Sequence, residues 1–334
     1  MKKVLYIGNH LKGGNPTTSN QLSLVLKELE IELASYSNKK NKIFRLLHMC
    51  WGLLKHRKAS IVLIDTYSTL NFYYALIVSQ LARLFYISYI PILHGGELPK
   101  RLEKNPYLSR LIFSKALINI APSKYLKEVF LSYNFKTEFI ANGIDLQRYS
   151  FKKRKQLAPK LLWVRAFDQI YNPFMAIAVL EALKKTYPKA QLCMVGPDKD
   201  GSLQQAKALA RLKKLTNNIE FTGYLTKEEW LQKAKNFDIF INTTTIDNTP
   251  VSVIEAMALG LPVVSTNVGG IPYLIAHEET GLLVESKNVE QMVAKILYLL
   301  NHESVGQQLT INARAMISKF DLETVKQSWK KILN

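Results

Sequence analysis

The sequence is poor in cysteine, glycine and proline and has no long apolar run, and each shortage excludes a class of protein. The two cysteines, Cys50 and Cys193, are too few for a disulfide framework or a cysteine-based zinc site. With 15 glycines and 12 prolines in 334 residues, the chain is neither fibrous nor of low complexity. The longest apolar stretch, residues 68–82, carries no charge but is interrupted at Arg83, whereas a membrane-spanning helix needs about 20 mainly apolar residues. We therefore expect a buried helix at residues 70–85.

Acidic residues are also scarce. The 26 Asp and Glu face 45 Lys and Arg, so that the formal net charge is +19. Such an excess is typical of proteins with a polyanionic partner, such as nucleic acid, acidic lipid or a phosphate-bearing substrate. The sequence contains no known basic motif or aromatic stacking platform that would favour nucleic acid. We therefore expect no nucleic-acid partner.

Hydrophobic residues make up 48% of the chain, which is enough for a sizeable core. At about 150 residues per domain, the length favours two domains. The chain begins MKKVLYIGNH, in which a short apolar stretch leads into a Gly/Asn loop. This beginning favours a first strand over a signal peptide, and hence a cytoplasmic location.

Short apolar runs alternate with amphipathic stretches along the whole chain. This pattern predicts α/β structure, with parallel sheets that helices cover on both faces. The expected strands lie at 4–8, 60–65, 86–93, 116–123 and 138–143 in a first group, and at 161–166, 190–196, 219–223, 238–244 and 261–266 in a second. The polar segment 145–160 is the expected linker. We thus predict two doubly wound Rossmann-like domains, residues 1–150 and 151–320, that face a central cleft.

The most informative stretch is DNTPVSVIEAMALGLP, residues 247–262. Thr249 is expected to cap a helix that has Pro250 at its first position and Gly260 just past its end. Because this helix directly follows a strand, its free N–H groups face the sheet edge where an anion binds. Glu255 lies on this helix and suits hydrogen bonding to a diol such as a ribose. A solvated glutamate without a function is the alternative.

At this point the chain resembles the retaining GT-B glycosyltransferases of family 4, also called glycosyltransferase group 1. Asp247 and Glu255 match the E-x7-E motif of that family, followed by EAMALGLPVV and NVGGIPYLIAHEETGLLV. Further matches follow in the family's order: Gly13-Gly14, His94-Gly95-Gly96, ANGID (141–145), Arg165, MVGPDKDG (194–201) and IEFTGYL (219–225). The resemblance covers about residues 4–285 and implies a two-domain enzyme that uses a nucleotide-sugar donor.

The resemblance also implies roles for the matching residues. Glu255 takes the position that holds the donor ribose, and Asp247 the position that contacts hydroxyls of the donor sugar. Arg165 would neutralise the diphosphate leaving group, a bidentate task for which arginine is suited. The rest of the expected donor site is the start of the helix and the residues before it: Asn248, Thr249, Pro250 and Val251.

One position departs from the family pattern. The family usually has a lysine five or six residues after the arginine, where this chain has Ile170 and Tyr171. We expect Tyr171 or Asn172 to hydrogen-bond the phosphates instead. Weaker stabilisation of the leaving group and a degenerate site are the alternatives.

Two glycine-flanked features belong to the first domain. His94 follows an apolar strand, and in the family this histidine donates a hydrogen bond within the catalytic centre; a structural histidine is the alternative. Gly13 and Gly14 allow a tight loop whose N–H groups approach phosphate or acceptor, so that Gly14 is an expected donor-binding residue. Their spacing, GNHLKGG, does not match GxGxxG, which argues against a nicotinamide cofactor.

Residues 38–58 contain seven Lys and Arg and no acidic residue. Helical spacing places six apolar residues on one face, with Phe44 and Trp51 close to it: Ile43, Leu46, Leu47, Cys50, Leu53 and Leu54. The pattern fits a helix that lies on an anionic membrane surface, although a helix packed on the first sheet is the alternative. The expected membrane-binding residues are Lys39, Lys40, Lys42, Trp51, Lys55, Arg57 and Lys58.

The resemblance implies a retaining glycosyltransferase, and together with the basic charge it suggests transfer of a sugar to a glycan or lipid-linked acceptor in bacterial surface polysaccharide synthesis. The expected catalytic residues are His94, Arg165 and Asp247. The resemblance implies that no metal or other cofactor is required. Asp198-Lys199-Asp200 is not expected to bind a metal, because it lies in a loop within a parallel-sheet pattern. We expect the C-terminal helix, 321–334, to join the first domain, and the protein to sit peripherally on the inner face of the cytoplasmic membrane. A nucleotide-sugar epimerase and a non-catalytic glycan- or membrane-binding subunit stay open.

Overall fold

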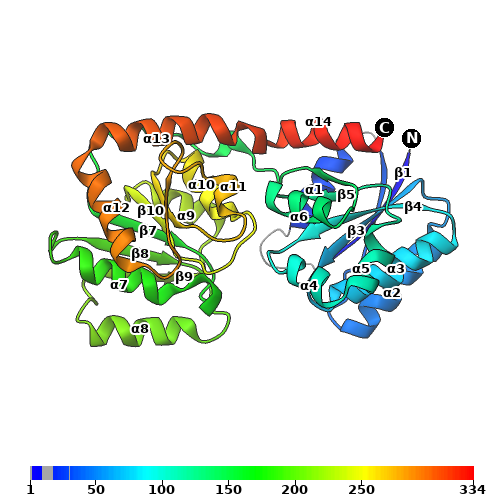
Figure 1. The fold of residues 1–334 in the computed structure, drawn as a ribbon, viewed down its shortest axis with the longest axis horizontal. Helices are drawn as coiled ribbons and strands as arrows, with labels where there is room; N and C mark the ends of the chain where they lie inside the picture. Colours follow the sequence, from blue (N-terminus) through cyan, green and yellow to red (C-terminus); the bar gives the residue numbers. More distant parts are fainter. Residues whose placement is uncertain (1, 10–17, 30) are drawn as a thin grey trace. The chain divides into compact units, whose positions relative to one another are not determined.

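The computed structural model describes residues 2–9, 18–29 and 31–334 (Figure 1). The chain divides into two compact units. The first consists of Met1–Ile144 with Lys319–Asn334, and the second of Asp145–Ser318. The segment 145–160, expected as a linker, therefore lies in the second unit, and the helix expected at 321–334 lies in the first.

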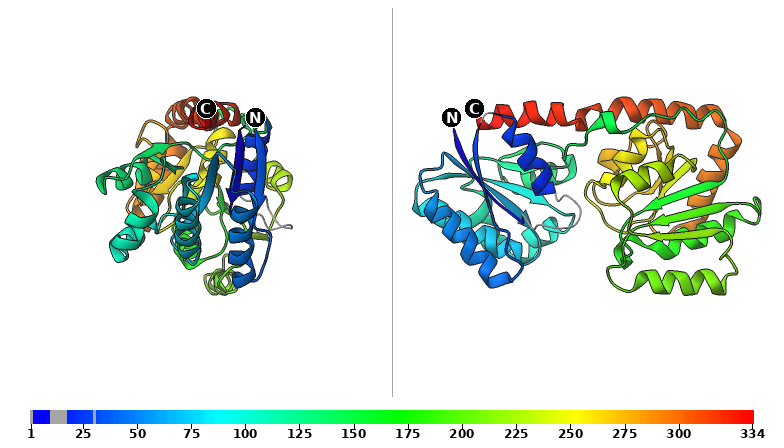
Figure 2. Two further views of the ribbon diagram at one scale, coloured as in Figure 1. Left: turned by 90° about the vertical axis from the view of Figure 1, so that its right-hand side faces the viewer. Right: turned by 180° about the vertical axis from the view of Figure 1, so that it is seen from behind.

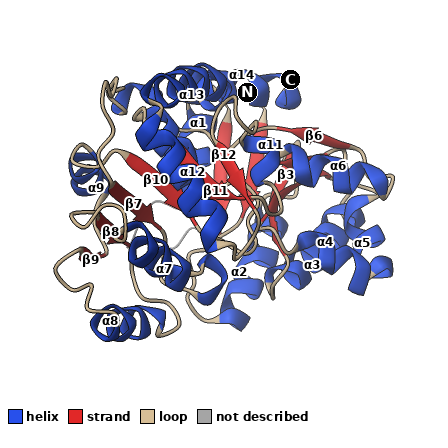
Figure 3. Ribbon diagram, turned by 60° about the vertical axis from the view of Figure 1, so that its left-hand side comes forward, coloured by secondary structure: helices blue, strands red, loops and turns tan. Residues whose placement is uncertain are grey.

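The first unit is built on a parallel sheet whose described strands have the order β2-β1-β3-β4-β5-β6, with helices on both faces (Figures 1 and 3). Its strands are β1 Lys3–Ile7, β2 Glu32–Tyr36, β3 Ile61–Tyr67, β4 Ser88–His94, β5 Asn119–Ala121 and β6 Thr137–Phe139. Its helices are α1 Thr18–Lys27, α2 Lys42–Lys55, α3 Asn71–Leu84, α4 Leu98–Lys104, α5 Pro106–Phe113, α6 Lys124–Ser132 and α14 Leu322–Leu333. The central strands read as continuous apolar runs because both of their faces are covered.

Helices α2 and α3 cover one face of this sheet. Helix α2 begins after Asn41, whose side chain accepts hydrogen bonds from the N–H groups of Ile43 and Phe44, as an N-cap does. Its buried residues are Met49, Gly52 and Leu53, and the two larger side chains pack in one cluster with strands β1, β3 and β4 and helix α3.

The six apolar residues expected on one face of α2 divide between the core and the surface. Leu53 is fully buried and Leu46 packs partly against the same core, whereas the side chains of Ile43, Leu47 and Leu54 are exposed. The sheet contacts only one side of the apolar arc, because a helix packs on a neighbouring layer through one narrow stripe of its surface. The other side of the arc stays at the surface.

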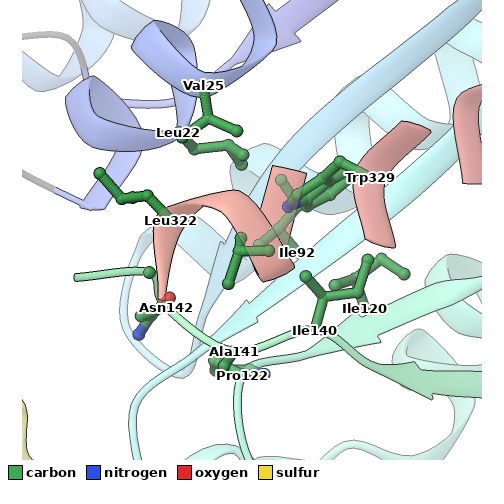
Figure 4. Close-up of a pocket in the computed structure, with 12 residues that line it drawn as sticks. Leu22, Val25, Ile92, Ile120, Pro122, Ile140, Ala141, Asn142, Leu322 and Trp329 are labelled. Atoms are coloured by element: carbon green, nitrogen blue, oxygen red, sulfur yellow. The ribbon is translucent and has the colours of Figure 1, made fainter. Parts of the chain in front are cut away.

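Helix α14 packs on the opposite side of the first unit, beside α1 (Figure 2). Trp329 of α14 is 2% exposed and faces Ile92 and Ile120 of the sheet and Val25 of α1 (Figure 4). These side chains line a small apolar cavity of about 30 Å³. The Lys2 ammonium donates to the carbonyl of Leu333 at 2.8 Å and so ties the two ends of this unit together.

The second unit is a parallel sheet whose described strands have the order β12-β11-β10-β7-β8-β9. Its strands are β7 Lys160–Val164, β8 Gln191–Val195, β9 Ile219–Gly223, β10 Ile239–Asn242, β11 Val263–Thr266 and β12 Leu282–Val284. Its α-helices are α7 Pro173–Leu183, α8 Ser202–Leu212, α9 Lys227–Ala234, α10 Val251–Ala258, α11 Ile271–Leu274, α12 Val289–Asn301 and α13 Glu303–Met316. Short 3-10 turns lie at Leu146–Arg148, Gln169–Tyr171 and Ile317–Phe320.

All ten strands expected from the sequence are present, and two further strands, β2 and β12, were not expected. Both lie at an edge of their sheet. The β2 sequence ELASY is only partly buried, so it lacks the apolar run that marks the central strands. Among the described helices, none is long and apolar enough to span a membrane.

The packing of α14 leads to a first prediction. Trp329→Ala removes a large buried side chain and should lower the free energy of unfolding by about 3–5 kcal/mol, measured as the urea unfolding of the whole chain. Gln327→Ala, on the exposed side of the same helix, is the matched control and should change stability by less than about 0.5 kcal/mol. Equal effects of the two substitutions would contradict the packing of α14 on the first unit.

Candidate functional site

The strand order of the second unit has a switch point between β7 and β10, the place where open α/β sheets have a crevice. The chain runs outward from β7 to β8 and β9, then returns to place β10 on the other side of β7. In open α/β sheets, ligands bind outside the carboxyl ends of the strands at such a switch point. Arg165 directly follows β7, and Asp247 lies in the loop between β10 and helix α10.

Arg165 lies in this crevice with its side chain only 15% exposed. Its guanidinium contacts the Asp247 carboxylate, and its central carbon lies 4.4 Å from the centre of the Tyr171 ring, a cation–π contact. Burial lowers the pKa of Arg165 from its ordinary value, but an arginine remains a cation at neutral pH. Its buried Nε has no hydrogen-bond partner among the described residues. The site thus holds a cation with a donor available for an anion.

Glu255 is another charged residue held inside this unit, and it is 4% exposed. The hydroxyl of Tyr149 donates to its Oε1 at 2.8 Å, and the ammonium of Lys227 contacts the same oxygen. Burial raises the pKa of Tyr149 to about 12, so this phenol is a proton donor at neutral pH. Burial is also the main cause that lowers the pKa of Lys227 to about 8. The glutamate is therefore not a solvated residue of a helix face.

Neither partner of Glu255 was expected from the sequence. Tyr149 lies in the segment expected as a polar linker. Lys227 is the first residue of α9, directly after Thr226, which forms a capping box with Glu229. The T-x-x-E pattern could have located this helix start, but only the fold brings Lys227 to Glu255.

The helix that carries Glu255 begins one residue later than expected. Pro250 is the N-cap of α10 and has an extended backbone, with ψ 114°, so Thr249 is not the capping residue and that expectation is wrong. Val251 is the first helical residue. Asn248 is buried, and its N–H donates to the Asp247 carboxylate at 2.8 Å. The loop before the helix is thus tied to one of its own acidic side chains.

Gly269 and Gly270 pack against this loop. A Cβ on Gly269 would overlap the carbonyl oxygen of Asp247, and one on Gly270 that of Asn248. Gly269 also has φ +53°, in the region that favours glycine. The Gly270 N–H donates to the Asp247 carbonyl at 2.9 Å. The glycine pair thus permits the close approach that holds the loop.

The two residues proposed to replace the missing lysine have different places. Tyr171 stacks on Arg165. Asn172 has left-handed backbone angles and is the N-cap of α7, where its side chain accepts a hydrogen bond from the N–H of Met175 at 3.2 Å. The Tyr171 ring therefore contacts the Arg165 guanidinium, whereas the side-chain oxygen of Asn172 already accepts a hydrogen bond at the start of α7.

In the first unit, His94 ends strand β4 and is 5% exposed. Its Nε2 lies 2.9 Å from Oδ1 of Asp65, which also accepts a hydrogen bond from the Tyr6 hydroxyl at 2.9 Å. The Tyr67 ring stacks on the imidazole, with centroids 4.5 Å apart and planes inclined by 17°. Burial and the Asp65 charge raise the pKa of Tyr67. Gly8 leaves room for this carboxylate, because a Cβ there would overlap its Oδ2.

The His94 environment contains a residue that the sequence analysis missed. Asp65 lies within an apolar strand, and nothing in its sequence neighbourhood marked it as the partner of a histidine. Strands β3 and β4 are neighbours, and their register places Tyr67 opposite His94, so that Asp65 lies two residues away on the same face. Gly13 and Gly14, expected to form a phosphate or acceptor loop, lie outside the described residues.

The carboxylates of Asp198 and Asp200 hold the loop before α8. Asp198 accepts a hydrogen bond from the Gly201 N–H at 2.9 Å, and Asp200 accepts one from the Gln169 N–H at 2.9 Å. The hydrogen bond from the Ser202 hydroxyl is the main cause that lowers the pKa of Asp200. Within the described part of the chain, no group of three or more His, Cys, Asp and Glu side chains could hold a metal ion.

Comparisons with known proteins show the family of this chain. Residues 147–316, just over half of the chain, match the sequence profile of the family described as "Glycosyl transferases group 1". The chain belongs to the group 1 glycosyltransferase family. An uncharacterised glycosyltransferase of Haemophilus influenzae is 29% identical over 158 residues, which are 47% of this chain and 44% of that protein. The chain thus spans less than half the length of this curated relative.

Solved structures resemble the whole chain in fold. Sucrose-phosphate synthase from Thermosynechococcus elongatus has a TM-score of 0.83 at 17% identity, with 99% of this chain and 98% of that chain covered. Anabaena HepE, solved in complex with UDP-glucose, has a TM-score of 0.77 at 17% identity over 100% and 99% of the two chains. The group 1 glycosyltransferase chain therefore has the GT-B fold, as expected from its sequence.

The hydrogen bond to Glu255 leads to a second prediction. Tyr149→Phe removes only the hydroxyl that donates to a buried carboxylate and should lower the free energy of unfolding by about 1.5 kcal/mol. Tyr107→Phe is the control, because Tyr107 is 72% exposed and should give no measurable change. Chemical denaturation of both variants tests this, and wild-type stability of Tyr149→Phe would contradict the hydrogen bond.

Proposed function

We propose that this chain is a retaining family 4 glycosyltransferase that uses a nucleoside-diphosphate sugar. The observation that carries the proposal is the crevice of the second unit, where Arg165 and Asp247 lie at the β7/β10 switch point, close in the chain to a helix that bears the buried Glu255. A cation and free helix N–H groups suit a diphosphate, and a buried carboxylate suits a ribose diol. HepE, which shares the fold, was solved with UDP-glucose and supports this class of donor.

In the proposed reaction, the bond between the anomeric carbon and the leaving phosphate oxygen breaks. The acceptor hydroxyl oxygen forms the new bond on the same face, and its proton passes to the leaving diphosphate. Arg165 stabilises the negative charge that grows on the diphosphate, and Asp247 contacts hydroxyls of the sugar. We propose that Asn248, Pro250 and Val251 complete the donor site and that no metal or other cofactor is required.

We propose that the first unit binds the acceptor, a glycan or lipid-linked intermediate of a bacterial surface polysaccharide, and that His94 is its catalytic residue. The contact with Asp65 supports an oriented histidine, because it occupies Nε2 and leaves Nδ1 as the other polar atom of the ring. The net charge of +19 supports an anionic partner and, with it, a cytoplasmic place at the inner face of the membrane.

A non-catalytic subunit is the second candidate, because the position that carries a lysine in the family is occupied here by Ile170 and Tyr171. The stacking of Tyr171 on Arg165 favours the enzyme, since it holds the remaining cation in the crevice. Donor binding and turnover separate the two candidates.

A third prediction concerns the donor site. We expect one of UDP-, GDP-, ADP- and CMP-sugars to raise the melting temperature without added metal, and Glu255→Ala to abolish this shift. Arg165→Ala should lower the rate of nucleoside-diphosphate release by about 10²–10³-fold, as is typical when a donor to developing charge is removed.

Lys189→Ala is the control for these substitutions. Lys189 is exposed and precedes β8, at the end of the strand away from the crevice, so both donor binding and turnover should keep wild-type values. Full activity of both Arg165→Ala and Glu255→Ala would refute the assigned site. Donor binding without turnover, with every acceptor class supplied, would support the non-catalytic subunit.

A fourth prediction separates two roles of Tyr171. If its ring holds Arg165 through the cation–π contact, Tyr171→Phe should change kcat less than about threefold, whereas Tyr171→Ala should lower it about tenfold. If the hydroxyl binds phosphate, Tyr171→Phe should be as impaired as Tyr171→Ala. Steady-state rates of the two variants on the same donor distinguish the outcomes.

A further inference from the structure

Helix α2 exposes a continuous apolar stripe on the side away from the sheet. The residues of this stripe, with their exposed fractions, are Ile43 (72%), Phe44 (64%), Leu47 (58%), Trp51 (60%) and Leu54 (46%). Their spacing places them on one side of the helix, while Met49 and Leu53 fill the core on the other. Exposed leucines occur singly on many proteins, but five large apolar side chains on one helix form a patch of the kind that marks an interaction site.

The segment around this apolar stripe is strongly basic. Seven cations flank it and no acidic residue occurs between positions 38 and 58: Lys39, Lys40, Lys42, Arg45, Lys55, Arg57 and Lys58. Arg45 donates to the carbonyls of Lys39 and Lys40, at 2.9 and 3.1 Å, and so holds the preceding lysines next to the helix start. Cations therefore lie at both ends of the stripe.

A basic pocket of about 210 Å³ lies at the C-terminal end of α2. Its polar lining residues are Lys3, Glu32, Lys55, His56, Arg57 and Lys58. Lys3 lies 3.2 Å from Glu32, the one acidic residue in this lining. Lys55, Arg57 and Lys58 are exposed, and none has an ion pair with the described residues. Leu54 of the apolar stripe is followed directly by Lys55 of the basic pocket, so that the two features adjoin.

We propose that α2 docks this protein on an anionic phospholipid bilayer, with the apolar stripe inserted among the acyl chains and a lipid phosphate in the basic pocket. Apolar side chains below a rim of lysine and arginine are the arrangement by which a helix lies in a membrane interface. The inference rests on the proposed function only in that a lipid-linked acceptor would be reached at the bilayer. It does not depend on the donor site, which lies in the second unit.

The charges of the segment favour a bilayer over the other partners of an apolar surface. A second copy of this chain, seated stripe to stripe, would bring two sets of seven cations together, and like charges at an interface oppose association. A nucleic acid would pair with the cations but would leave Phe44, Leu47 and Trp51 without an apolar environment. An anionic bilayer satisfies both features at once.

The test is co-sedimentation of the whole protein with vesicles of neutral phosphatidylcholine and with vesicles that contain about 30 mol% phosphatidylglycerol. Binding should require the anionic lipid and weaken with salt, because screening shortens the range of the attraction. At about 1 kcal/mol for each basic residue, Lys55→Gln with Lys58→Gln should lower the partition coefficient about 30-fold. Trp51→Ala should lower it about tenfold, since an inserted aromatic side chain is removed.

Each variant has a matched control in the second unit. Lys185→Gln with Lys189→Gln removes two exposed lysines, and Leu212→Ala removes a leucine that is 77% exposed; both should bind like the wild type. The variants on α2 should keep the thermal shift given by the donor, and Glu255→Ala should keep vesicle binding. A failure of donor binding therefore overturns the proposed function alone, and a failure of vesicle binding overturns this inference alone.

Three results would overturn the docking surface. One is equal binding to neutral and anionic vesicles, and a second is equal loss of binding in the α2 variants and their controls. The third is dimerisation without lipid, measured by light scattering, that Trp51→Ala abolishes. A thermal shift by soluble glycerol phosphate as large as that given by anionic vesicles would assign the basic pocket to a free phosphate instead.

Discussion

A parallel sheet brings the carboxyl ends of all its strands to one edge, and the chain must reverse its direction of travel to build the second half of that sheet. Where it does so, the connections leave in opposite directions and a crevice remains. The second unit reverses between β7 and β10, and the first between β1 and β3. The groups proposed to act in this glycosyltransferase follow from that constraint, because Arg165, Asp247 and Asp65 all lie at or just beyond strands that flank a reversal.

Charges placed in such crevices are costly unless they are paired. Removing an ion from water costs several kcal/mol even after relaxation, so a buried charge needs partners of opposite charge or strong hydrogen bonds. Here Arg165 contacts Asp247, and Glu255 accepts a hydrogen bond from Tyr149 and contacts Lys227. In the proposed function these partners hold Arg165 and Glu255 in place before the donor binds. The diphosphate then pairs with the Arg165 cation, and the ribose hydroxyls donate to the Glu255 carboxylate.

The apolar runs and their spacing were sufficient to predict ten strands and the helix that carries Glu255, since continuous apolar strands arise wherever both sheet faces are covered. The edge strand β2 was not predicted, because it is only partly buried and lacks an apolar run. Helix α10 begins one residue later than predicted, because Pro250 has an extended backbone. On α2 the spacing predicted an apolar arc correctly but could not tell which part of it meets the sheet, because periodicity does not identify a neighbour.

By itself, the sequence determined the two-unit α/β architecture, the resemblance to group 1 glycosyltransferases and the basic character of the chain, since these depend on local pattern and on composition. The tertiary structure alone decided that Tyr149 and Lys227 meet Glu255, that Asp65 meets His94, and that α2 leaves Trp51 at the surface. These pairings join residues far apart in the chain. The order and packing of the strands and helices decide these contacts, and no short stretch of sequence determines that packing.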